Sequence, residues 1–347
     1  AMPQEETDWE SLTFGYYPTD YNVRSYYSKG VWSRPELCAD PMVAVHLAAT
    51  GLNYGQQAFE GLKAFRCRDG RVCLFRPEEN ARRLQSSCAG IMMPEVPEDL
   101  FLEACQLVVK HNSRFVPPYG SGAALYLRPL VIGMGPHVGV SESSEYLFSI
   151  YACPVGPYFK RGVTSVPVVI QRSYDRAAPR GTGRFKVGGN YAASFRAMHE
   201  AYEEGYQGGC LFLDPQEKKF IDECGSANFF GIRGGTYITP RSESILASVT
   251  NESLMTIASD LGLSVERRPI PVEELSTLDE AAACGTAAVI CPISKIVDLD
   301  TGRIYDYGDE PGPVCRELYD HLTGIQSGRL PDRHGWLTEV DLQPGAE

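Results

Sequence analysis

The sequence lacks the features of several common classes of protein. Basic residues are in the minority, 32 Lys and Arg against 44 Asp and Glu, so the formal net charge is −12. This balance argues against nucleic acid and anionic membranes as partners, because both attract basic surfaces. No apolar run approaches the ~18 residues of a membrane span. Hydrophobic residues make up 43% of the 347 residues and charged ones 22%, the composition of an ordinary globular protein.

No Cys-x-x-Cys pair occurs, and the eleven cysteines are an odd number. The start “QEETDWE” is acidic, where a secretory signal would begin basic and continue apolar. We therefore expect reduced thiols and an intracellular protein. We expect the protein in the cytoplasm. Because Ala1 precedes Met2, a targeting segment could have been removed, and the location would then be mitochondrial.

Motifs of several frequent active sites are absent as well. The phosphate loop GxxxxGK[ST], GxSxG and HExxH do not occur, and “GTGRFKVG” departs from GxGxxG at its third glycine. The six histidines are scattered and form no ligand-like pair, so we expect no metal site. A lysine-centred site is the best remaining candidate.

Strand and helix patterns alternate irregularly along both halves of the chain. One helix is predicted to begin at Pro77. Three more are predicted over 97–112, 190–205 and 250–262, and Thr250 is the expected N-cap of the last one. Without a steady βαβ rhythm, two α/β or α+β domains are favoured over one doubly wound sheet. The segment “PVGPYFKRG”, with two prolines and two glycines, is the candidate linker.

The segment “GRFKVGGNYAAS” places Lys186 in a glycine-rich turn just ahead of a helical stretch. Glycines allow a backbone and a ligand to approach closely. A buried, deprotonated lysine forms Schiff bases with carbonyls, and its commonest dedicated partner of this kind is pyridoxal 5'-phosphate, PLP. PLP also needs an acid for its pyridine nitrogen, a donor for its phenolic oxygen and a cradle for its phosphate.

Candidates for these three further parts exist. Glu223 in “FIDECGSANFF” could pair with the ring nitrogen, and Tyr191 could donate to the phenolic oxygen. Arg76 in “LFRP” and the helix start at “SVTN” could hold the phosphate, because helix N-termini bind anions. Taken singly, each is better explained as ordinary structure: a solvated lysine, an edge-strand carboxylate, a packing tyrosine, an arginine paired with a nearby glutamate, and a helix cap.

In combination, these segments resemble the branched-chain amino acid aminotransferase family of PLP fold type IV. The family's order is followed from about Phe14 to near Trp336 by “GLNYGQQAFEGLKAFR”, “LFRPEENARRL”, “LYLRP”, “CPVGPYF”, “KVGGNYA”, “IDECGSANFF”, “ILASVTNESL” and “GTAAVICPI”. The segment “RAAPRGTGRFKVGGNYA” is most similar to eukaryotic members, fungal ones among them.

The resemblance implies an α/β (α+β) fold with a small N-terminal domain over 1–156, a linker over 157–164 and a large C-terminal domain over 165–347. It implies PLP-dependent transamination of branched-chain L-amino acids with 2-oxoglutarate, giving the 2-oxo acid and L-glutamate. It also implies a homodimer in which the partner chain completes each pocket. The alternatives are a transaminase of D-amino acids or amines or a lyase on the same fold, and a non-catalytic PLP-binding relative.

The resemblance also implies the role of each site residue. Lys186 would bind PLP covalently and move the substrate proton, Glu223 would pair with the pyridine nitrogen, and Tyr191 with the phenolic oxygen. The expected phosphate ligands are Arg76, Val249, Thr250 and Thr286. The expected substrate pocket is lined by Phe14, Tyr54, Phe59, Tyr126, Arg128, Tyr158, Ser226, Thr286 and Ala287. Arg128 is our candidate partner for the side-chain carboxylate of glutamate; on a strand it would face the same way as Tyr126.

Two segments depart from the family's pattern. “ILASVTN” stands where “ILPGVTR” is usual, which puts Ala247 and Ser248 in the phosphate turn and Asn251 in place of an arginine. Ala288, three residues before Cys291, removes the redox Cys-x-x-Cys of some vertebrate members. We expect the backbone to keep the phosphate cradle, and we expect no such thiol switch.

Overall fold

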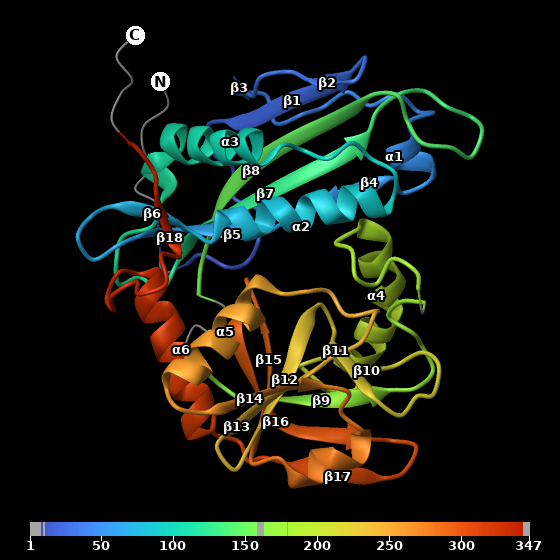
Figure 1. Ribbon diagram of the computed structural model, residues 1–347, viewed down its shortest axis with the longest axis vertical. Helices are drawn as coiled ribbons and strands as arrows, with labels where there is room; N and C mark the ends of the chain where they lie inside the picture. The colour runs from blue at the N-terminus through green and yellow to red at the C-terminus, as the bar shows by residue number, and fades with distance from the viewer. Residues whose placement is uncertain (1–7, 10, 158–162, 179, 343–347) are drawn as a thin grey trace.

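The computed structural model describes residues 8–9, 11–157, 163–178 and 180–342 (Figure 1). Within these residues the chain forms two nine-stranded sheets, one in the upper and one in the lower part of Figure 1, with helices packed on each. None of the helices in these ranges is long and apolar enough to cross a membrane.

The first sheet is antiparallel throughout, in the order β18-β6-β5-β7-β8-β1-β2, with β3 on β1 and β4 on β7. Its strands are β1 (Asn22–Ser28), β2 (Val31–Trp32), β3 (Glu36–Cys38), β4 (Gln57–Phe59), β5 (Leu62–Arg66), β6 (Val72–Phe75), β7 (Ala124–Gly133), β8 (Tyr146–Val155) and β18 (Leu337–Glu339). The associated helices are α1 (Thr50–Asn53), α2 (Pro77–Gly90), α3 (Glu98–His111) and the 3₁₀ turn η1 (Ser113–Phe115). As predicted, α2 begins at Pro77, where the missing N–H costs no hydrogen bond.

The second sheet is mixed, in the order β11-β10-β9-β16-β15-β12-β13-β14, with β17 on β16. Its strands are β9 (Val166–Gln171), β10 (Cys210–Leu213), β11 (Ile221–Cys224), β12 (Ala227–Arg233), β13 (Thr236–Pro240), β14 (Ser264–Arg268), β15 (Glu280–Gly285), β16 (Val289–Asp298) and β17 (Arg303–Asp306). Its helices are α4 (Gly188–Glu203), α5 (Val249–Asp260), α6 (Pro313–Gln326) and the 3₁₀ turn η2 (Val272–Thr277). The two sheets with their helices confirm the predicted α/β class.

The C-terminal strand β18 crosses from one half of the fold to the other. It follows α6 of the second sheet, yet pairs antiparallel with β6 at the edge of the first. Trp336, just before it, packs edge-to-face on Phe75 with ring centroids 5.6 Å apart. The domain boundaries drawn from the sequence stay a prediction. They assign β18 to the second domain, although this strand pairs with the first sheet.

The start of α5 corrects one expectation. Ser248, not Thr250, is the N-cap: its backbone is extended, and its hydroxyl accepts a hydrogen bond from the Asn251 N–H at 3.2 Å. Thr250 already lies in the first turn. Asn251, which replaces the family's arginine, is buried and bonds two residues of β13: its side chain accepts from Tyr237 Oη at 2.6 Å and donates to Thr239 Oγ1 at 3.0 Å.

Candidate active site

A cavity of about 480 Å³ lies between the two sheets, because side chains from both line it. Most of the residues predicted for the site line this one space: Phe14, Phe59, Tyr126, Arg128, Lys186, Tyr191, Ser226, Thr286 and Ala287. They come from segments far apart in the sequence, which the fold brings together. The cavity is therefore the candidate active site.

Lys186 is fixed where the first turn of α4 meets the first sheet. Its N–H donates to Ser87 Oγ at 2.8 Å, and its carbonyl accepts from the Phe59 N–H at 3.0 Å. Nearby, Gly183 passes so close to Ser244 that a Cβ would lie 2.5 Å from the Ser244 carbonyl oxygen. This close packing explains part of the glycine-rich turn and holds the lysine backbone rigidly.

The amine of Lys186 is buried and donates to Tyr191 Oη at 2.7 Å. Burial, assisted by the nearby guanidinium of Arg83, lowers the pKa of Lys186 to about 7. A substantial fraction of the amine is therefore neutral at physiological pH and able to attack a carbonyl. Burial also raises the pKa of Tyr191 to about 12, which keeps its phenol protonated as a donor.

Glu223 on β11 lies directly behind the cavity wall, with its carboxylate held from two sides. Its Oε2 is 2.6 Å from Arg176 Nε, and its Oε1 accepts from the Leu246 N–H at 3.0 Å. Burial raises the pKa of Glu223 to about 7, and Arg176 opposes that shift. Asn228, whose amide lies 3.4 Å from Glu223 Oε1, lines the cavity. Arg176 was not predicted as a site residue, although it is the first residue of the segment “RAAPRGTGRFKVGGNYA”.

Of the two arginines near the start of α2, Arg83 lines the cavity and Arg76, the expected phosphate ligand, does not. Arg83 lines the cavity and is bidentate with Glu60, at 2.6 Å from Oε1 and 2.7 Å from Oε2. Arg76 instead donates to Ser253 Oγ at 2.7 Å and stacks on Trp336. The physical reason is backbone geometry: Arg76 precedes the helix in a left-handed conformation, whereas Arg83 lies nearly two turns into α2.

A small recess at the N-terminus of α5 adjoins this cavity. Val249, Thr250 and Thr286, all predicted phosphate ligands, line it. Thr286 lines the main cavity as well. Free backbone N–H groups at a helix N-terminus attract phosphate, so this recess can hold the anionic end of a cofactor.

Arg128 and Tyr126 share one face of β7, as their spacing predicts. Arg128 Nη2 donates to Tyr126 Oη at 3.0 Å, and the guanidinium lies 5.0 Å from the Phe59 ring centroid. Its buried Nε has no hydrogen-bond partner among the described residues. No carboxylate of these residues forms an ion pair with the Arg128 guanidinium. A buried cation of this kind is poised for an anionic ligand.

Two predicted substrate residues are not placed in this cavity. Tyr54 follows α1, does not line it, and donates its hydroxyl to the Val138 carbonyl. Tyr158 lies outside the described residues. Val138 and Val140, in the loop between β7 and β8, are 89% and 88% exposed.

The donor set of the cavity fits PLP. A neutral lysine, a protonated phenol beside it, a carboxylate–arginine pair behind the wall and a helix N-terminus are the four parts that PLP needs. The volume, about 480 Å³, lies in the usual range of ligand pockets.

Comparison with known proteins agrees with this chemistry. The family model described as “Amino-transferase class IV” matches residues 57–296. The branched-chain-amino-acid aminotransferases of Haemophilus influenzae and Helicobacter pylori are 46% and 48% identical to this chain, over 97% and 98% of it and 100% of each relative. Transaminase htyB of Aspergillus rugulosus is 40% identical over 99% of this chain and 94% of its own length.

Solved structures share the whole fold. The branched-chain amino acid aminotransferase of Escherichia coli matches with a TM-score of 0.77 and 28% identity, over 93% of this chain and 100% of that one. The branched-chain amino acid aminotransferase of Thermobaculum terrenum, solved in its PLP form, matches with a TM-score of 0.75 and 28% identity, over 93% and 98%. The predicted fold type IV architecture is thereby confirmed, and the chain belongs to the class IV aminotransferase family.

Proposed function

We propose that this protein is a PLP-dependent transaminase that moves the amino group of branched-chain L-amino acids to 2-oxoglutarate, giving the 2-oxo acid and L-glutamate. The observation that carries the proposal is the buried amine of Lys186, 2.7 Å from Tyr191 Oη, in a cavity that also contains an unpaired guanidinium. The two bacterial relatives, identical at 46% and 48% of positions over nearly the whole chain, bear the name of this activity.

PLP, when bound, would delocalise the negative charge that develops at the substrate's Cα. Lys186 is the base that moves the proton from that carbon. Glu223, whose charged form Arg176 stabilises, would hold the proton on the pyridine nitrogen, and Tyr191 would donate to the phenolic oxygen. The Lys186 amine and the Tyr191 hydroxyl are joined by their own hydrogen bond, and Glu223 is buried between Arg176 and the Leu246 N–H, so little reorganisation is needed during the reaction.

The phosphate of the cofactor is assigned to the recess at α5. The N–H groups of Val249 and Thr250 and the hydroxyl of Thr286 would bind it. Lys63 lines the same recess, and Arg83 would add positive charge from the adjoining cavity. Arg76 acts one step away, through Ser253 in the first turns of the same helix. Glu60 orients Arg83.

Substrate choice follows from the lining of the cavity. Phe14, Phe59 and Tyr126 form an aromatic wall suited to aliphatic side chains. Such a wall separates Leu, Ile and Val poorly, because one methylene is worth only ~1–3 kcal/mol. Ser226 and Ala287 complete the wall, and Arg128 is the cation for the side-chain carboxylate of glutamate.

We propose a homodimer in which Tyr54 serves the cavity of the partner chain. Its hydroxyl bonds the loop that carries Val138 and Val140, two of the most exposed apolar side chains in the described part of the molecule. Exposed apolar residues grouped in this way are typical of protein interfaces. The domain division at 157–164, the kinship with eukaryotic members and an intracellular location are further proposals. The fungal relative and the eleven unbridged cysteines support the last two.

The proposal is tested with L-leucine, D-alanine and a chiral amine as donors, each with 2-oxoglutarate. We expect glutamate to form with L-leucine only. Turnover with D-alanine or the amine instead would favour the other transaminase specificities. A colourless protein that takes up no added PLP would favour the non-catalytic alternative.

A further inference from the structure

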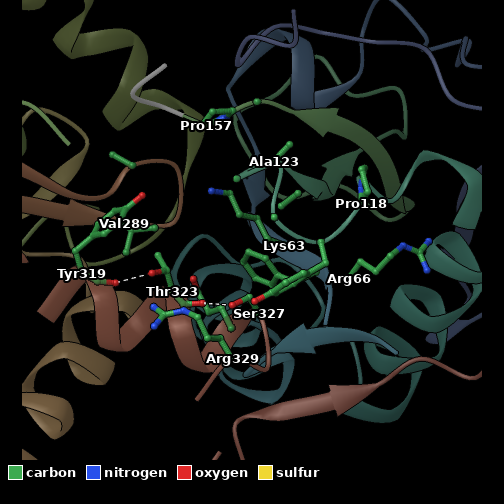
Figure 2. A pocket seen from close by; sticks show the side chains of 18 of the residues that line it. Lys63, Arg66, Pro118, Ala123, Pro157, Val289, Tyr319, Thr323, Ser327 and Arg329 are labelled. Atoms are coloured by element: carbon green, nitrogen blue, oxygen red, sulfur yellow. Dashed lines mark hydrogen bonds between the residues drawn. The ribbon is translucent and has the colours of Figure 1, made fainter. Parts of the chain in front are cut away.

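A second pocket, of about 290 Å³, adjoins the active-site cavity (Figure 2). Ala287 and Ala288, in the turn between β15 and β16, line both spaces. The other walls come from β5, the segment ahead of β7 and the end of α6. The two spaces are therefore separated by a single turn of the backbone.

The most unusual side chain in this pocket is Lys63 on β5. Figure 2 shows its amine pointing toward the middle of the pocket. The amine donates to the Ala287 carbonyl at 3.0 Å, and no carboxylate of the described residues forms an ion pair with it. Burial alone lowers the pKa of Lys63 to about 8. A buried ammonium with one carbonyl partner has two donors left for a ligand.

Arg329 adds positive charge at the rim of the same pocket, whereas the guanidinium of Arg66 points away from it (Figure 2). Arg329 donates to the Asp320 carbonyl at 2.8 Å, and Arg66 makes only long contacts to backbone carbonyls, at 3.4 and 3.5 Å. None of the described residues that line the pocket is Asp or Glu. In a chain with a net charge of −12, such a pocket is a local site of positive potential.

The rest of the lining is largely apolar. Phe65, Pro118, Pro157 and Val289 contribute hydrocarbon surface, and Tyr319 adds an aromatic face. The volume is at the lower end of the range for ligand pockets, ~300–1,000 Å³. These properties select a compact molecule with an anionic group and an apolar body.

We propose that this second pocket is a binding site for a small organic carboxylate, held through Lys63 and Arg329, and that its occupation is coupled to the active-site cavity through the 286–288 turn. A carboxylate that binds the two remaining donors of Lys63 draws the ammonium away from the Ala287 carbonyl. The 286–288 turn, which forms part of the wall of the active-site cavity, then loses its hydrogen bond to Lys63 of β5. Binding at either site changes the affinity of the other by the same factor.

The probe is 4-methylpentanoate, which has neither an amino nor a keto group to react. Calorimetric titration of the holoenzyme should find two sites per chain. Lys63→Met should abolish the second site or weaken it by at least ~10-fold, the loss expected when a hydrogen bond to a charged group is removed. Arg329→Gln, an exposed change with little risk to folding, should weaken it severalfold, and Arg333→Gln, exposed and outside the lining, should not.

The coupling, which rests on the proposed function, is read from kinetics. Inhibition or activation of leucine turnover by 4-methylpentanoate should keep a component that saturating leucine does not remove and that Lys63→Met abolishes. One site per chain in the wild type, or a second site unchanged in both variants, would overturn the proposal. Two-site binding without any leucine turnover would instead reject the proposed function and leave the second site standing.

Discussion

Arg128 is the residue on which the proposed acceptance of both leucine and glutamate depends. Its guanidinium is buried between aromatic rings with Tyr126 Oη as its side-chain partner at 3.0 Å. We expect Arg128→Met to impair the glutamate half-reaction by roughly 2–5 kcal/mol, the usual cost of removing one partner of a buried charge pair. The leucine half-reaction should change much less. Single-turnover rates with each amino acid measure both effects, and a melting curve is the control; parallel losses in both rates and in stability would mean that Arg128 is only structural.

Lys186 should make the stability of the cofactor-free protein depend on pH. Its pKa falls from the ordinary 10.5 to about 7 on folding. Between these values the unfolded chain holds a proton that the folded chain has released. The free energy of unfolding therefore rises with pH across this window, by at most about 1.4 kcal/mol per pH unit. The contribution is complete above the unfolded pKa and is lost as the pH falls through the folded one.

The measurement is urea unfolding of the cofactor-free protein at several pH values from about 7 to 9. The unfolding free energy of the wild type minus that of Lys186→Met should rise with pH. Lys295→Met, at an exposed lysine of β16, is the matched control and should leave the wild-type slope unchanged. A difference that stays constant would show that Lys186 is not deprotonated by burial.

Single residues also mark where prediction from sequence stops. Lys186 and Tyr191 could be found because they lie only five residues apart, Lys186 just ahead of α4 and Tyr191 in its first turn, and the amine does reach the phenol. Arg76 and Arg83 could not be told apart in this way, because only the left-handed backbone at Arg76 turns its side chain toward α5. Arg176 was missed because its partner, Glu223, is 47 positions away in sequence and is reached only through the fold.

Among the elements, α5 is the helix whose N-terminus lines the proposed phosphate recess. Ser248 caps it by accepting the Asn251 N–H, while Val249 and Thr250 line the recess. We expect Ser248→Ala to cost about 1 kcal/mol of stability, the usual effect of losing an N-cap. It should also weaken PLP binding, since the cap fixes the N–H groups. Ser259→Ala, whose hydroxyl bonds the helix's own Met255 carbonyl near the other end, is the control for both melting and PLP titration. Equal losses in the two variants would exclude a special role for the cap.

Element prediction succeeded where a local signal decides the structure and failed where it does not. Pro77 marks the start of α2 through its own backbone restriction. Ser248 and Thr250 are both good capping residues, and only the extended backbone at Ser248 separates them. Strand β18 has three residues, too few for a periodic pattern, and its pairing with β6 comes from the tertiary fold.

For the whole molecule, the proposed dimer leads to a test at Val138. The loop between β7 and β8 projects from the first sheet at the upper right of Figure 1, and β17 lies at the opposite end of the molecule. We expect Val138→Asp to give monomers in sedimentation and to lower leucine turnover, because a carboxylate in a buried apolar contact is strongly disfavoured. Leu299→Asp, at the exposed turn before β17, should stay dimeric and active. A dimeric, fully active Val138→Asp protein would place the interface elsewhere.

The central claim is that Lys186, and not Lys63, binds PLP covalently. Both amines have lowered pKa values, of about 7 and about 8, so reactivity alone does not separate them. Only Lys186 has the phenol of Tyr191 and the Glu223–Arg176 pair close at hand. Borohydride reduction of the PLP-loaded protein, followed by peptide mass mapping, should find the pyridoxyl adduct on Lys186 alone; an adduct on Lys63 would contradict the assignment of the active site.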